Sequence, residues 1–138
     1  MKLVFDIEPV SQARPRIVSK PFPRLYDPKP VKLYKEELKR LAGLKMDELK
    51  QQPFNGAISV QVTFYRSIQK SISKVEHQRR QYGITLPSVK PDVDNYVKAF
   101  FDGLNGTVWT DDAQITDLKA SKRYSETPKI VMEVTRIE

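Results

Sequence analysis

KPDVDNYVKAFFDGLNGTVWTDDAQI, residues 90 to 115, contains the strongest helical pattern of this chain. Its apolar side chains fall within about 100° of arc when each residue turns by ~100°. These side chains are Val93, Val97, Phe100, Phe101 and Leu104. The stripe predicts an amphipathic helix over residues 93–104 that turns one face toward the core. A short extended piece at residues 107–110 and a turn at residues 111–114 should follow it.

Outside this segment, alternating apolar and polar residues predict strands. They cover residues 2–8, 58–65, 115–124 and 129–137. A long helix is predicted over residues 31–52, which Gly43 would divide, and a short one over residues 74–82. Ser73 begins the short helix with capping-box spacing. The long helix should bury the side formed by Val31, Tyr34, Leu38, Leu41, Leu44 and Leu49. This order predicts one α+β domain over residues 1–138, with a mixed or antiparallel sheet of about four strands and two to three helices packed on it.

The composition limits the chemistry that the chain can perform. It has no cysteine and one histidine, His77, which excludes thiol nucleophiles, thiolate metal sites and sites built from two histidines of one chain. Catalysis must therefore use other polar groups, with His77 incidental on a polar helix. No apolar run could span a membrane, and Asp6 and Glu8 interrupt the N-terminus where a signal peptide is apolar. We expect a cytoplasmic protein without membrane association.

Charge is distributed unevenly along the chain. The net charge of +7 favours a polyanionic partner such as nucleic acid. Residues 92–117 nevertheless hold six acids and one base, so the rest of the chain carries +12. Crowded carboxylates repel one another unless a cation joins them. The pattern favours a basic body that binds phosphate and an acidic segment that binds metal.

A proline-rich basic segment follows the first strand. Six of the ten prolines lie between residues 9 and 30, which predicts a long loop or a ragged hairpin. A loop of this length inside a domain is usually functional. Its cations are candidate phosphate contacts, with plain solvation as the alternative. The candidate DNA-binding residues are Arg14, Arg16, Lys20 and Arg24, together with Lys90 beside the acidic segment.

The acids at the start of residues 92–117 also have ordinary structural explanations. Asp92 or Asp94 can cap the helix that follows, although capping needs only one carboxylate. Asp94, Lys98 and Asp102 follow one another at i, i+4 and i+8, as surface ion pairs do. On spacing alone, both explanations stay open.

Asp111 and Asp112 likewise fit an Asp-rich turn, or a cap for the piece that begins at Ala113. The coincidence of these features within 21 residues favours a shared role. Mg²⁺ takes oxygen ligands and is commonly held by a few carboxylates plus a substrate phosphate. Two carboxylates at a helix start and one from the following loop would supply such a set. An EF-hand is excluded, because Tyr96 occupies its fifth position.

The residue types and their spacing resemble the signature of RusA-type Holliday-junction resolvases, the crossover junction endodeoxyribonucleases. The matching motifs are Lys90-Pro-Asp-Val-Asp-Asn95, Lys98, Asp102, Gly103-Leu-Asn-Gly106 and Asp111-Asp-Ala-Gln114. The resemblance extends, more weakly, to Ala13-Arg-Pro-Arg16 and residues 71–83, and so covers most of the chain. Gly103 departs from the family pattern, where alanine is more usual, and we expect it to loosen the helix end.

The resemblance implies that Asp92, Asp94 and Asp112 bind Mg²⁺, with Mn²⁺ as a substitute. It also implies that Lys98 is a catalytic cation. Family members are similar in being small homodimers, often encoded by prophages, that bind four-way DNA junctions and cut two opposed strands. They act in DNA recombination and repair without a small-molecule cofactor. The remaining positions that are usually acidic in the family are Asp111 and Asp102.

In this interpretation one or two Mg²⁺ ions activate a water, while Lys98 stabilises the transition state or the leaving oxygen. Trp109 should pack beside the site, with base stacking as the alternative. Two other functions stay open: a non-catalytic basic nucleic-acid-binding module with a structural acidic turn, and a scaffold protein with a solvated charged face. Mg²⁺-dependent strand cleavage would separate the nuclease from the binding module.

Overall fold

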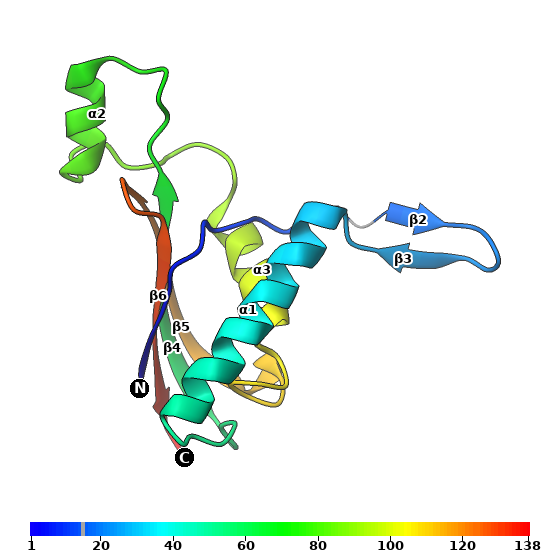
Figure 1. Cartoon of the computed structure of the whole chain (residues 1–138). Helices are drawn as coiled ribbons and strands as arrows, with labels where there is room; N and C mark the ends of the chain where they lie inside the picture. Colours follow the sequence, from blue (N-terminus) through cyan, green and yellow to red (C-terminus); the bar gives the residue numbers. More distant parts are fainter. Residues whose placement is uncertain (15) are drawn as a thin grey trace.

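The computed structural model describes residues 1–14 and 16–138, and the side chain of Arg16, a predicted DNA-binding residue, lies outside the described part. The chain follows the predicted order of elements, with a hairpin in the basic segment (Figure 1). The elements are β1 (Lys2–Phe5), β2 (Arg16–Val18), β3 (Arg24–Tyr26), α1 (Lys29–Glu48), β4 (Ile58–Ser67), α2 (Lys74–Gln81), α3 (Val93–Leu104), the 3₁₀ helix η1 (Asp112–Gln114), β5 (Ile115–Ser125) and β6 (Lys129–Arg136).

Four strands form the main sheet, in the order β1-β6-β4-β5. β6 is antiparallel to both β1 and β4, whereas β4 and β5 are parallel. A parallel pair needs a crossover connection, and the chain from β4 to β5 makes it through α2 and α3. The prediction of a single α+β domain with a mixed sheet of about four strands is confirmed.

The core lies between this sheet and the helices α1 and α3, which cover one of its faces (Figure 1). Phe100 of α3 meets the ring of Phe64 edge to face, with ring centroids 5.5 Å apart, a favourable geometry for aromatic pairs. The opposite face of the sheet carries exposed polar side chains, among them Gln61 and Glu133. The buried residues of β4 alternate, as predicted: Ile58, Val60, Val62 and Phe64.

α1 is one continuous helix, so the predicted break at Gly43 is wrong. The helix ends at Glu48 instead of near residue 52. Leu44 and Leu49 are exposed, in contrast to the prediction. A helix of 3.6 residues per turn rotates Leu44 away from the buried stripe, and Leu49 lies beyond the last residue of the helix. That stripe is formed by Val31, Tyr34, Leu38, Ala42 and Met46.

α3 has the predicted bounds, but the side of the helix that is buried is rotated slightly from the predicted apolar stripe. Tyr96 is buried, while Val93 and Val97 are only half-buried. A Cβ atom on Gly103 would lie 2.9 Å from Cδ1 and 3.0 Å from Cβ of Leu38 in α1. The glycine therefore allows a close helix contact, and the expected loosening of the helix end is not what it produces.

Residues 106–108 form a turn, in which the N–H groups of Thr107 and Val108 donate to the carbonyl oxygen of Leu104. Of the predicted extended piece, only Trp109 pairs as a strand does, in isolated bridges with Phe54 and Asn105. Trp109 is fully buried. Its Nε1 donates to Oδ1 of Asn105 at 2.6 Å, and its ring meets Phe101 edge to face at 5.4 Å. The prediction that Trp109 is a packing residue is confirmed, but it packs beyond the C-terminal end of α3, away from Asp92 and Asp94.

β2 and β3 pair as an antiparallel hairpin that projects from the body of the molecule (Figure 1). The ragged hairpin predicted for the basic segment is therefore present. We call β2, β3 and the turn between them, residues 16–26, the arm.

α2 lies on the side of the molecule away from the arm, beyond the end of the sheet (Figure 1). Ser73 caps it as predicted, because its hydroxyl accepts a hydrogen bond from the Glu76 N–H at 3.1 Å. Within the described ranges, every helix is too short or too polar to cross a bilayer.

Candidate functional site

Asp92 and Asp94 lie at the N-terminal end of α3, and both are exposed. Asp92 occupies the N-cap position with extended backbone angles, φ −68° and ψ 148°, but its side chain makes no capping hydrogen bond. Asp94 lies in the first turn. The helix dipole stabilises negative charge at this end. Asp92 therefore stands at the capping position, but its carboxylate does not act as a cap.

Lys98 lies one turn after Asp94 on the exposed side of α3. Its Nζ is 3.9 Å from Oδ2 of Asp94, and the two side chains are 63% and 65% exposed. An exposed i,i+4 pair of this kind contributes only a few tenths of a kcal/mol to stability. The ammonium group is therefore available to a negatively charged ligand.

Asp102 has a different environment, although it follows Lys98 by four residues. Its Oδ2 accepts a hydrogen bond from Nζ of Lys35 at 3.1 Å, and the same Nζ donates to Asp27 at 2.7 Å. The bond from Lys35 is also the main reason that the pKa of Asp27 is below its usual value. Through Lys35, Asp102 therefore links α3 to α1 and to Asp27, the residue that follows the arm. This contact gives Asp102 a role in the fold.

Asp111 caps η1, as its ordinary structural explanation predicts. Its carboxylate accepts a hydrogen bond from the Ala113 N–H at 3.0 Å, and Oε1 of Gln114 accepts one from the Asp111 N–H at 3.0 Å. The amide of Gln114 also donates to the carbonyl oxygen of Phe54 at 2.8 Å. Asp112 is half-buried in the first turn of η1. These bonds fix both acids near the beginning of β4.

The two acidic pairs lie at opposite ends of β4 and α3. Gln114 is bonded next to the start of β4, whereas Arg66, near the end of β4, donates to the carbonyl oxygen of Lys90 at 3.0 Å. Eight strand residues at ~3.3 Å each separate these contacts by about 26 Å along the strand. No three His, Cys, Asp or Glu side chains of the described residues are grouped to hold a metal ion. One chain thus does not bring Asp112 together with Asp92 and Asp94.

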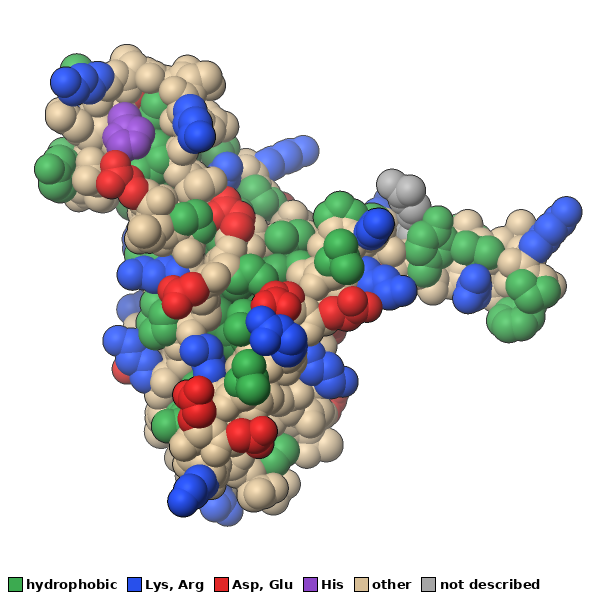
Figure 2. All heavy atoms as spheres, viewed as in Figure 1, with side chains coloured by type: hydrophobic (Ala, Val, Ile, Leu, Met, Phe, Trp, Pro, Cys, Tyr) green, Lys and Arg blue, Asp and Glu red, His purple; other side chains and the backbone are tan. Residues whose placement is uncertain are grey.

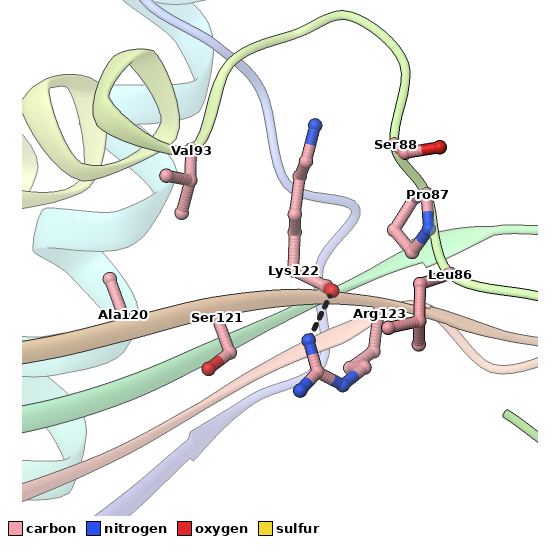
Figure 3. Close-up of a pocket in the computed structure, with 8 residues that line it drawn as sticks. All are labelled: Leu86, Pro87, Ser88, Val93, Ala120, Ser121, Lys122 and Arg123. Carbon is pink, nitrogen blue, oxygen red and sulfur yellow. Dashed lines mark hydrogen bonds between the residues drawn. The ribbon is translucent and has the colours of Figure 1, made fainter.

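Two cations hold the loop that leads into Asp92. Nζ of Lys122 in β5 donates to the carbonyl oxygens of Val89 at 2.6 Å and Pro91 at 2.8 Å. Arg66 of β4 binds the carbonyl oxygen between them, that of Lys90. Figure 3 shows the Lys122 side chain extending from β5 toward this loop. The sequence analysis missed both residues.

A hollow of about 290 Å³ lies beside the same loop, between it and β5 (Figure 3). Val93, the first residue of α3, lines one side, and Lys122 and Arg123 line the other. A concave surface with two cations therefore adjoins the helix end that carries Asp92.

The predicted DNA-binding residues occupy two places. Arg14, Lys20 and Arg24 are exposed on the arm or at its base, and Lys90 is exposed two residues before Asp92. The backbone of Arg16 lies in β2, but its side chain is outside the described part. The hairpin thus carries Lys20 and Arg24, with Arg14 at its base, whereas Lys90 lies next to the start of α3.

The donor set at the start of α3 fits a hard divalent cation. Asp92 and Asp94 offer exposed carboxylate oxygens, which suit Mg²⁺ or Mn²⁺. Mg²⁺ keeps several waters and often binds through one or two carboxylates plus a substrate phosphate. Asp92 and Asp94 would therefore supply two ligands of such a metal, and waters, the substrate phosphate or a further carboxylate would supply the others.

Comparison with known proteins places the chain among deoxyribonucleases that cut within DNA. The family model described as "Endodeoxyribonuclease RusA" matches residues 6–135. The chain therefore belongs to the RusA endodeoxyribonuclease family, as the sequence motifs indicated. It is also similar to "Uncharacterized protein YqaN" of Bacillus subtilis (strain 168), with 36% identity over 133 residues, which cover 94% of this chain and 92% of the relative.

Proposed function

We propose that this protein is a Mg²⁺-dependent endonuclease that resolves four-way DNA junctions by cutting two opposed strands. One observation carries the proposal: Asp92 takes the N-cap position without making the capping bond, which leaves its carboxylate available two residues before Asp94, with Lys98 one turn after Asp94. Membership in the RusA endodeoxyribonuclease family supports DNA as the substrate. We expect the protein to act in the cytoplasm, in DNA recombination and repair.

The residues of the site divide the chemistry among them. Asp92 and Asp94 would hold the metal through carboxylate oxygens. Mg²⁺ bound there would supply an activated water and neutralise charge on the scissile phosphate, and Mn²⁺ accepts the same ligands. Lys98 donates to the phosphate or the leaving oxygen, where negative charge develops. Arg66 and Lys122 orient Asp92 by holding the three carbonyl groups that precede it.

A homodimer is the expected functional form. A four-way junction is two-fold symmetric, and a C2 dimer presents one site to each of two opposed strands. The position of Asp112 adds a second argument. Because Asp112 lies at the far end of α3 from Asp92 and Asp94, it can join their metal site only from a partner chain.

Mixing two inactive variants tests this shared site. If each site takes Asp94 from one chain and Asp112 from the other, a mixed dimer of Asp94→Asn and Asp112→Asn chains has one site with both wild-type residues and one site with both substitutions. Nicking of one strand should then return. Sites that are complete within one chain would leave each site with one defect, and the mixture would stay inactive. Sedimentation equilibrium of the wild-type chain, at about twice 16.0 kDa without DNA, checks the dimer itself.

The second candidate function is a non-catalytic DNA-binding module, which the capping role of Asp111 favours. Synthetic four-way junctions and linear duplexes, each incubated with Mg²⁺ and with EDTA, separate the two. We expect cleavage of the junction in Mg²⁺ alone, with symmetric products from opposed strands. Junction binding without cleavage in Mg²⁺ or Mn²⁺ would establish the module instead.

A further inference from the structure

The arm has an apolar surface that the rest of the described chain leaves uncovered. Ile17 is 75% exposed, and Leu25, which pairs with it across the strands and so shares its face, is 68% exposed. Phe22 in the turn is 63% exposed. An isolated two-stranded hairpin is only marginally stable in water, and clustered exposed apolar side chains mark interaction sites. We infer that a partner covers the arm.

The charge of the arm indicates the class of that partner. Residues 14–26 contain four cations and no acid. Lys20 and Arg24 are exposed and flank Phe22 by two residues on each side. Figure 2 shows hydrophobic and basic side chains along the arm, and no acidic ones, in this view. DNA matches both properties, because its phosphates attract cations and its bases offer flat apolar faces. A second copy of this chain, itself at +7, matches them less well.

The base of the arm is fixed to the helix that carries the candidate site. Gln12 precedes the arm in the chain and Asp27 follows it, so these two residues mark its base. Nε2 of Gln12 donates to Oδ1 of Asp27 at 3.0 Å. The Gln12 N–H donates to the carbonyl oxygen of Asn95 in α3 at 2.9 Å. Lys35 joins Asp27 to Asp102, also in α3. DNA held by the arm would therefore be oriented relative to the carboxylates at the start of α3.

We propose that Phe22 stacks against exposed bases at the branch point of a DNA junction, while Lys20 and Arg24 bind the flanking phosphates. Pro21 and Pro23 restrict the backbone on both sides of Phe22, which lowers the entropy lost on binding. In continuous duplex the base faces are covered by stacking, whereas a branch point exposes them to an apolar side chain. Phe22 would thus select branched over linear DNA. This inference rests on the proposed function.

The test measures DNA binding by the full chain in EDTA, where metal-dependent cleavage does not occur. The probes are a four-way junction with 2-aminopurine beside the branch point and a linear duplex with 2-aminopurine in the same sequence. Phe22→Ala should weaken junction binding about tenfold and abolish the fluorescence change, while duplex affinity is unchanged. Phe22→Trp should preserve both signals. Tyr82→Ala, which removes an aromatic side chain that is 74% exposed outside the arm, is the matched control.

Three results would overturn the proposal. The first is Phe22→Ala that binds the junction like the wild type with the same fluorescence change. The second is loss of self-association by Phe22→Ala without DNA, which would assign the arm to a second copy of the chain. The third is a wild-type protein without preference for the junction over the duplex. Cleavage assays in Mg²⁺ on the same proteins show independently whether the proposed nuclease function stands.

Discussion

The two ends of α3 have acidic pairs in different surroundings. At the N-terminal end, Asp92 makes no capping bond, and both Asp92 and Asp94 are exposed. Beyond the C-terminal end, Asp111 accepts a backbone N–H and is closed into a capping box by Gln114. A carboxylate that satisfies backbone groups contributes to the fold, whereas one without that role is available to a ligand. The hydrogen bonds around each acid, more than its spacing, therefore distinguish the two pairs.

The largest effect expected from this difference is at the N-terminal pair. Asp94→Asn should reduce Mg²⁺-dependent junction cleavage at least about a hundredfold, because it removes a metal-ligand charge. Junction affinity should stay equal or increase, because repulsion with phosphate falls. Cleavage rates and binding isotherms check both. Asp117→Asn, at an exposed acid of β5, is the control, and wild-type cleavage by Asp94→Asn would contradict the metal assignment.

Lys98→Ala should lose most of the cleavage activity, about a hundredfold, while the fold is retained. The exposed pair with Asp94 contributes too little to stability for its loss to unfold the protein. Circular dichroism and thermal melting, measured beside the cleavage rate, test this expectation. A variant that unfolds would favour the structural ion pair over the catalytic role.

Lys122→Met tests the positioning of the N-terminal pair. It removes the donor to the carbonyl oxygens of Val89 and Pro91, so the loop before Asp92 should lose its fixed conformation. We expect about tenfold slower cleavage and a higher Mg²⁺ concentration at half-maximal rate. Lys119→Met, at an exposed lysine of the same strand outside the hollow, should change neither. An unchanged Mg²⁺ dependence in folded Lys122→Met would refute the positioning role.

The smallest effect should come from Asp111, the member of the C-terminal pair that caps η1. Asp111→Ala should lower the free energy of unfolding by about 1 kcal/mol, the usual contribution of an N-cap, as urea denaturation measures. Cleavage per folded molecule should stay at the wild-type rate. A large loss of cleavage with unchanged stability would assign Asp111 to the metal site instead of the capping role. The acids at the two ends of α3 would then no longer differ in function.

The sequence predicted the elements whose pattern is local. The stripe of α3 gave its bounds correctly, and Ser73 gave the start of α2, because helical spacing and capping depend on neighbouring residues only. In α1, the predicted leucine stripe included residues that the structure leaves exposed. Several leucines lie around the helix, so their spacing does not decide which side is buried. Local patterns thus gave the bounds of α3 and the start of α2, but neither the end of α1 nor the side of α1 that is buried.

The contacts of the candidate site were less accessible to sequence analysis. Asp102 meets Lys35, and Lys122 meets the loop before Asp92, across long stretches of chain whose approach no spacing rule specifies. One signal was present for Lys122. It pairs with Phe64 in parallel register, at an inward-facing position of β5 where an apolar residue would be expected. The separation of Asp112 from Asp92 likewise depends on how the turn after α3 is bonded, as by Gln114.

The contact between Gly103 and Leu38 has a consequence for related sequences. A methyl group at residue 103 would lie within 3.0 Å of the leucine side chain, closer than packed carbon atoms tolerate. A smaller residue at position 38 would remove the contact with Cδ1 but not the contact at 3.0 Å with Cβ, which every residue except glycine has. Chains with alanine at position 103 must therefore have a wider spacing between the two helices, so the residue at this position should set how closely α1 and α3 approach across related sequences.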